Sequence, residues 1–81
     1  MKYIATFFSH FGAIRFEKNC KNKNISAKLM PVPRTLSSSC GTCVSYESNS
    51  YNPLGDISDE IEQIVEVSED GYREHYRAEN S

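Results

Sequence analysis

Residues 31–43, PVPRTLSSSCGTC, interrupt the regular structure of this chain and separate its two halves. Pro31 and Pro33 each lack an N–H and fix φ, so neither residue can continue a β-ladder. We therefore expect the backbone to leave regular structure at Pro31 and to resume it near Thr42. The stretch contains a thiol, a guanidinium group and several small hydroxyl groups. A loop would carry them, and loops are where binding chemistry concentrates in folded proteins.

The residues before this loop predict a strand, a helix and a second strand. Residues 2–8 are rich in β-branched and aromatic side chains and are apolar on both faces, which is typical of a central strand. Ser9 is a suitable N-cap for a helix over residues 11–22, where apolar side chains recur at helical spacing. Asn24 can adopt the left-handed conformation that ends a helix. Residues 25–30 then alternate apolar and polar side chains, as in a half-buried strand.

The residues after the loop predict a third strand, a second helix and a short last strand. Residues 42–46 alternate again, and residues 47–55 are polar and contain Pro and Gly, which is typical of a connection. Asp56 can cap a helix. An apolar stripe at helical spacing follows it, formed by Ile57, Ile61, Ile64 and Val65. A turn at residues 69–71 would lead into an edge strand over residues 72–76.

The resulting order βαββαβ predicts an α+β domain of the ferredoxin-like type, with two helices on one face of an antiparallel sheet. A shorter variant without the last strand is the alternative. We expect residues 1–76 to form this single domain and residues 77–81 to be a flexible tail.

The composition of the 81-residue chain, with 38% hydrophobic and 25% charged residues, suits a small folded domain. The net charge of −2 gives no support to a nucleic-acid partner, which would need a basic face. No apolar run approaches the ~20 residues of a membrane span, so we expect no membrane partner. Three cysteines do not suggest a secreted disulfide scaffold. We expect a cytoplasmic protein whose thiols are reduced.

The loop also carries the signature of a family. Its pattern Pro-x-Pro-Arg-x-x-Ser-Ser-Ser-Cys-Gly resembles that of the selenium/sulphur carrier protein-like family, small domains that occur alone or fused to sulphur-carrier modules. The agreement extends to residues 6–9, 13–14 and 17–18 and to the strand that enters Pro31. The resemblance implies that Cys40 holds sulphur or selenium, as a persulphide or selenosulphide, between a donor protein and an acceptor protein. It implies a carrier more than an enzyme.

Cys40 is the first candidate for a reactive residue. Thiolate reactivity depends on partial exposure and nearby positive charge, and a polar loop can supply both. Arg34 could fold back over the thiol and lower its pKa. The backbone N–H groups of residues 38–41 could form an anion-binding nest, which the conformational freedom of Gly41 favours. The side chains that could either donate to a bound group or form turns are Ser37, Ser38 and Ser39. The alternative is a half-buried cysteine with inert neighbours.

Cys43 completes a Cys-Gly-Thr-Cys spacing that redox dithiols use. A thioredoxin-like motif would start a helix here, whereas we expect a strand. Thr42 and Val44 would share one face of that strand and Cys43 would point to the other. A bond between Cys40 and Cys43 would then require the loop to turn back. Cys43 is therefore either a resolving thiol or a structural residue.

A structural zinc site is a weaker alternative, because zinc needs four ligands. Besides the two loop cysteines, the chain offers only Cys20, His10 and His75. Cys20 falls on the apolar face of the first helix. His10 lies in its first turn, where we expect a neutral, exposed imidazole. We expect neither a metal nor a cofactor.

Two other functions compete with the carrier. One is a regulatory or interaction module, in which the loop binds an anion or a protein and Cys40 is structural. The other is a small thiol redox protein that uses Cys40 and Cys43.

Overall fold

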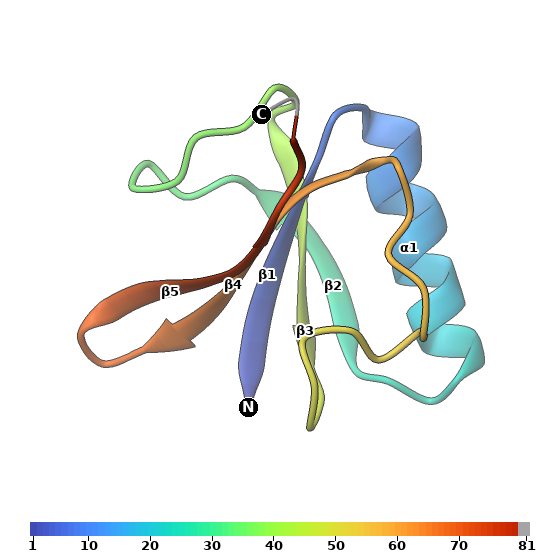
Figure 1. The fold of residues 1–81 in the computed structure, drawn as a ribbon. Coiled ribbons are helices and arrows are strands. Elements are labelled where there is room, and N and C mark those ends of the chain that lie inside the picture. Colours follow the sequence, from blue (N-terminus) through green and yellow to red (C-terminus); the bar gives the residue numbers. More distant parts are fainter. Residues whose placement is uncertain (80–81) are drawn as a thin grey trace.

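The computed structural model describes residues 1–79, which form one helix packed against one face of a five-stranded antiparallel sheet (Figure 1). In chain order the elements are β1 (Lys2–Phe7), α1 (His10–Asn22), β2 (Ala27–Pro31), β3 (Thr42–Glu47), β4 (Ile61–Ser68) and β5 (Gly71–Arg77). The strands lie in the order β2-β3-β1-β4-β5, and every neighbouring pair is antiparallel. Because β3 is inserted between β1 and β2, these three strands and α1 form a split βαβ unit.

The first helix begins and ends as its sequence predicts. Ser9 has an extended backbone, and its Oγ accepts a hydrogen bond of 3.2 Å from the N–H of Gly12. Asn24 has a φ of 61°, so the left-handed turn expected after the helix is confirmed. Its N–H donates to the carbonyl of Lys21, and the N–H of Ile25 donates to that of Cys20. These bonds satisfy carbonyl groups that the end of the helix leaves free.

The predicted second helix is wrong, and the ferredoxin-like arrangement with two helices is therefore wrong as well. Residues 48–60 form an irregular connection with turns, and β4 begins at Ile61. The register between β1 and β4 shifts by one residue, because Phe7 pairs with Ile61 whereas Thr6 pairs with Gln63. This bulge brings Ile61 and Ile64 to the same face of the sheet. A spacing of three residues on one face is the pattern of a helix, which explains the misassignment.

The last strand is present, so the variant without it is also excluded. β5 pairs with β4 through a tight turn in which Ser68 lies opposite Gly71. Gly71 has a φ of 126°, a conformation that side chains disfavour. The strand reaches Arg77, one residue beyond the range we predicted, and the N–H of Ala78 still donates to the carbonyl of Glu62 at 2.9 Å. Residues 80 and 81 of the predicted tail lie outside the described residues.

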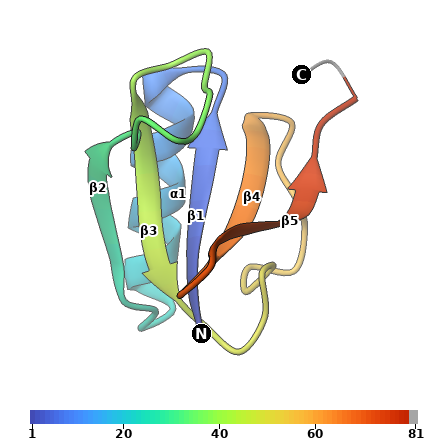
Figure 2. The ribbon, with the colours of Figure 1, turned by 90° about the vertical axis from the view of Figure 1, so that its left-hand side faces the viewer.

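The two faces of the sheet are covered by different parts of the chain. On one face, α1 buries an aromatic core, formed with the strands by Tyr3, Ala5, Phe7, Ala13, Phe16, Cys20, Val44, Tyr46, Ile61 and Ile64. On the other face, residues 32–41 cross the central strands as a loop (Figure 2). Val32 and Leu36 of that loop pack on Ile4, Cys43 and Val65. Figure 2 shows this loop in front of the sheet and α1 behind it. We call these the helix side and the loop side.

No helix within residues 1–79 is long and apolar enough to cross a membrane.

Candidate functional site: a thiol loop held by a buried carboxylate

The loop over residues 32–41 is closed at its base by the backbone. The N–H of Val32 donates to the carbonyl of Gly41 at 3.1 Å, which continues the pairing of β2 with β3. Pro31 is the last residue of β2 and lies opposite Thr42, so the strand ends one residue later than the range over residues 25–30 that we predicted. Within the loop, the N–H of Leu36 donates to the carbonyl of Pro33 at 3.0 Å and forms a turn.

Glu62 holds the far end of this loop on the sheet. Its two carboxylate oxygens accept hydrogen bonds from Ser39, at 3.1 Å from the N–H and 2.8 Å from Oγ. Glu62 sits in the bulge of β4 and is only 8% exposed, so the carboxylate is bound in a largely dry environment. The sequence indicated no role for Glu62, because residue 62 falls in the second helix that we predicted. The available signal was a carboxylate within a run of β-branched residues, where an inward-facing charge needs a partner.

The three thiols differ in their accessibility. Cys20 and Cys43 are fully buried, whereas Cys40 is half-buried in the loop. Burial raises the pKa of Cys20 from 9.0 to about 11, and the Glu17 carboxylate adds to the shift. Burial also raises the pKa of Cys43 from 9.0 to about 11, with a smaller contribution from Cys40. The prediction that Cys20 belongs to the apolar face of the helix is confirmed.

Cys43 points toward the loop, on the face opposite Val44. It packs with Ile4 and Val65 on the loop side, whereas Val44 belongs to the helix-side core. This orientation confirms the predicted alternation of β3. The Cys43 Sγ lies 3.7 Å from the carbonyl oxygen of Pro31 and donates a weak hydrogen bond to it.

The predicted anion-binding groups are arranged differently from the expected nest. The N–H of Ser39 is bound to Glu62, and the N–H of Cys40 donates to Ser38 Oγ at 3.3 Å. Arg34 is exposed and forms no hydrogen bond or ion pair within residues 1–79. Gly41 does not have a positive φ, and a Cβ there would meet no atom within 4 Å. Two of the donors therefore already have acceptors, and Arg34 forms no hydrogen bond with Cys40 within the described residues.

Ser37 is exposed in the loop. An imidazole lies next to the end of the loop, a contact that the sequence did not predict. His10 is exposed, as predicted, but its Nδ1 lies 3.0 Å from Thr42 Oγ1 and forms a hydrogen bond with it. This contact joins the start of α1 to the first residue of β3, directly after Gly41. It spans 32 positions in the sequence, and no local pattern could predict it.

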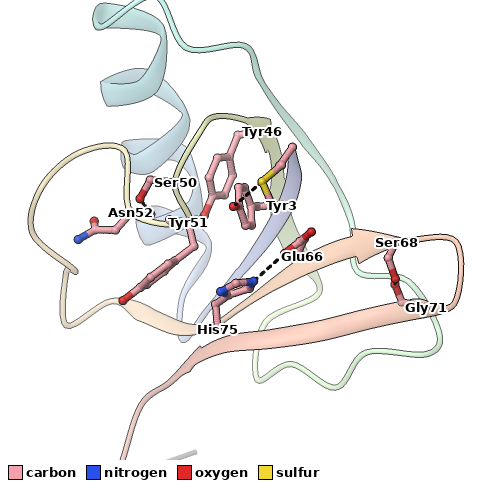
Figure 3. A network of polar contacts seen from close by, with 10 residues as sticks. Tyr3, Tyr46, Ser50, Tyr51, Asn52, Glu66, Ser68, Gly71 and His75 are labelled. Atoms are coloured by element: carbon pink, nitrogen blue, oxygen red, sulfur yellow. Dashed lines mark hydrogen bonds and ion pairs between the residues drawn. The ribbon is translucent and has the colours of Figure 1, made fainter.

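The candidate zinc ligands do not assemble. Among the described residues, no three His, Cys, Asp or Glu side chains are grouped so that they could hold a metal ion. His75 belongs to a separate network, in which its Nε2 lies 2.8 Å from Glu66 Oε1 (Figure 3). Its ring stacks on Tyr51 and meets Tyr3 edge-on, with ring centroids 5.4 and 5.6 Å apart.

These features define a class of protein: a small α+β domain that presents one accessible thiol on a loop tied to its sheet. The chain belongs to the Putative Se/S carrier protein-like family, whose model matches residues 2–77. The match spans both halves of the chain and confirms the family indicated by the loop. No curated protein and no solved structure matches the chain.

Proposed function

We propose that this protein carries sulphur or selenium on Cys40, as a persulphide or a selenosulphide, from a donor protein to an acceptor protein. The observation that carries the proposal is the difference between the thiols: Cys40 is partly exposed, whereas Cys20 and Cys43 are buried and have raised pKa values. A nucleophilic thiol must be reached by its donor and must ionise. The family match supports a carrier rather than an enzyme.

Loading requires only one nucleophile. The Cys40 thiolate attacks the outer sulphur of a donor R–S–SH, and the new Sγ–S bond forms as the bond to R–S breaks. The products are Cys40–S–SH and the thiolate R–S⁻, so electrons balance without an external oxidant. A donor R–S–SeH gives Cys40–S–SeH in the same way.

The loaded loop must hold an anion, because a persulphide is more acidic than a thiol. Arg34 has no ion-pair partner in the described chain, so its guanidinium is available to pair with the outer sulphur or selenium. The hydroxyl groups of Ser37 and Ser38 are further donors from the same loop.

Release can occur in two ways. An acceptor thiolate attacks the outer atom and takes it from Cys40. Alternatively, Cys43 acts as a resolving thiol: its Sγ attacks Cys40 Sγ, the bond to the outer sulphur breaks, and HS⁻ leaves with the Cys43 proton. The second route leaves a Cys40–Cys43 disulfide, and the burial of Cys43 makes it the slower one. A cycle of free thiols suits the reducing cytoplasm, where we place the protein.

The test is the intact mass of the protein after incubation with a cysteine desulphurase and cysteine. We expect one added sulphur on the unchanged protein and on Cys43→Ala, and none on Cys40→Ala. Cys20→Ala is the control for loss of a buried thiol and should load normally. Loading that survives in Cys40→Ala but not in Cys43→Ala would reverse the assignment of the two loop cysteines.

A further inference from the structure

An open cavity of about 410 Å³ lies on the loop side of the sheet, between the thiol loop and the β4–β5 hairpin. The loop contributes Thr35 and Ser37 to its wall, and the hairpin contributes Gln63, Tyr72, Glu74 and Arg77. The cavity therefore combines hydroxyl groups, one amide, one aromatic ring and two opposite charges. The proposed carrier reaction uses none of these hairpin residues.

The two charges in the cavity select the kind of ligand. Glu74 Oε1 lies 2.6 Å from Arg77 Nε, and both side chains are about half exposed. An exposed pair of this kind contributes little to stability, so both groups can take new partners. A carboxylate would bind Arg77 and an ammonium group would bind Glu74. A simple anion such as sulphide would instead meet the repulsion of Glu74, so the site favours a zwitterion.

Gln63 is a buried polar residue in the wall of the cavity. The residue is only 6% exposed and lines the cavity, yet its Oε1 accepts no hydrogen bond from residues 1–79. Thr6, its partner in the register with β1, also has a buried Oγ1 without a partner in the described chain. Buried polar atoms of native proteins are rarely unpaired, because each such atom costs free energy. Gln63 Oε1 itself has no exposed surface, so the side chain must rotate toward the cavity before an N–H donor of a ligand can bind it.

The cavity lies close to the reactive loop. Ser37 lines it, and Cys40 follows three positions later, so their Cα atoms are at most about 11 Å apart. Ser39 is bound to Glu62, the residue next to Gln63, which holds the end of the loop beside the cavity. A small thiol compound bound by its amino-acid group can therefore place its sulphur near Cys40.

We infer that this cavity binds the α-amino-acid group of a low-molecular-weight thiol, and that the perthiol of such a compound loads Cys40 without a donor protein. The inference rests on the proposed carrier function for the loading step. The Cys40 thiolate attacks the outer sulphur of the bound R–S–SH; Cys40–S–SH forms and R–S⁻ leaves. No oxidant or reductant is consumed.

Binding is tested without the reaction. S-methylglutathione and S-methylcysteine, which cannot transfer sulphur, are titrated into the ¹⁵N-labelled protein and followed by NMR. We expect shifts of the amides of residues 35–37, 63 and 72–77, and an increase in Kd of about tenfold in Arg77→Gln and in Glu74→Gln. Arg73→Gln, on the same strand but outside the cavity, is the control and should bind normally. Tighter binding of S-methylglutathione would identify the ligand as a peptide, and tighter binding of S-methylcysteine would identify it as a free amino acid. Shifts confined to other regions would overturn the inference and leave the carrier proposal intact.

Loading is tested with glutathione persulphide and with inorganic polysulphide, which has no amino-acid group. We expect Arg77→Gln to slow loading by glutathione persulphide about tenfold and to leave loading by polysulphide unchanged. Equal slowing with both donors, or no slowing with either, would overturn the cavity as the donor site. If neither donor adds sulphur to Cys40 and the desulphurase also fails, the carrier function itself is wrong.

Discussion

The helix side and the loop side of the sheet are built from the same strands but by different kinds of contact. On the helix side, aromatic rings fill the space: Phe16 lies 5.4 Å from Phe7 and 5.2 Å from Tyr46 between ring centroids. On the loop side, the thiol loop is held on the sheet by the side chains of Val32 and Leu36 and by the hydrogen bonds of Ser39 to Glu62. The helix side therefore stabilises the fold, and the loop side is free to carry a thiol that must meet other molecules.

The largest effect that would sharpen this comparison is the loss of a ring from the helix side. Phe7 is 1% exposed and contacts the helix through Phe16, so Phe7→Ala removes packing and leaves a cavity. We expect the free energy of unfolding to fall by about 3–5 kcal/mol. Leu36→Ala, on the loop side, should cost less than half as much, because Leu36 is only partly buried. Urea denaturation of both variants measures the difference, and equal costs would contradict the division of roles.

The second prediction concerns the reactivity of the thiols at neutral pH. The pKa values of Cys20 and Cys43 are raised from 9.0 to about 11, which lowers their thiolate fractions about a hundredfold. We expect iodoacetamide to label Cys40 first, as followed by peptide mapping. Labelling of the two buried thiols should rise about tenfold for each pH unit up to about pH 11, because only the thiolate reacts. If Cys43 labels as fast as Cys40 at pH 7, the loop does not shield it.

The third prediction is a substitution within the helix-side core. Cys20 has no exposed surface, and Cys20→Ser would bury a hydroxyl group there. We expect a loss of about 1–3 kcal/mol in the free energy of unfolding, and a smaller loss for Cys20→Ala. Thermal melts of the two variants decide this. Two unchanged melting temperatures would mean that the helix does not bury this residue.

The same contrast explains which parts of the molecule the sequence could predict. On the helix side, the caps of α1 and the burial of Cys20 follow from local patterns, and the structure confirms them. The bulge at Thr6 and Phe7 could not be read from the sequence, because it depends on the register between two distant strands. Because of this bulge, Ile61 and Ile64 lie on one face of β4 although they are three positions apart, which is the spacing of a helix.

On the loop side, the sequence identified the thiol but not what surrounds it. Cys40 stands in a recognisable motif. Glu62, by contrast, binds the loop from 23 positions away, and His10 binds the first residue of β3, directly after the loop, from 32 positions away. The cavity also depends on the pairing of β5 with β4, because that pairing brings residues of β5 to the same cavity as residues of the loop. Contacts of this kind arise from topology, and periodicity in a single sequence does not encode them.

The smallest expected change in stability comes from releasing the thiol loop. Glu62→Leu keeps the volume of a buried side chain but removes both hydrogen bonds to Ser39. Since Ser39 is exposed, water can replace the acceptor, and we expect a loss of only about 1–2 kcal/mol in the free energy of unfolding. The local effect should be larger than this figure suggests. Hydrogen exchange at the Ser39 amide should accelerate, whereas exchange in β1 and β3 should change only by the loss of global stability.

The control for this change is Glu66→Leu. It removes a carboxylate from the same strand, but this carboxylate binds His75 and not the loop. It should leave the exchange of the Ser39 amide as it is. If Glu62→Leu destabilises the protein as much as Phe7→Ala does, the carboxylate supports the core. The loop side could then not be described as a cover that opens independently of the helix side.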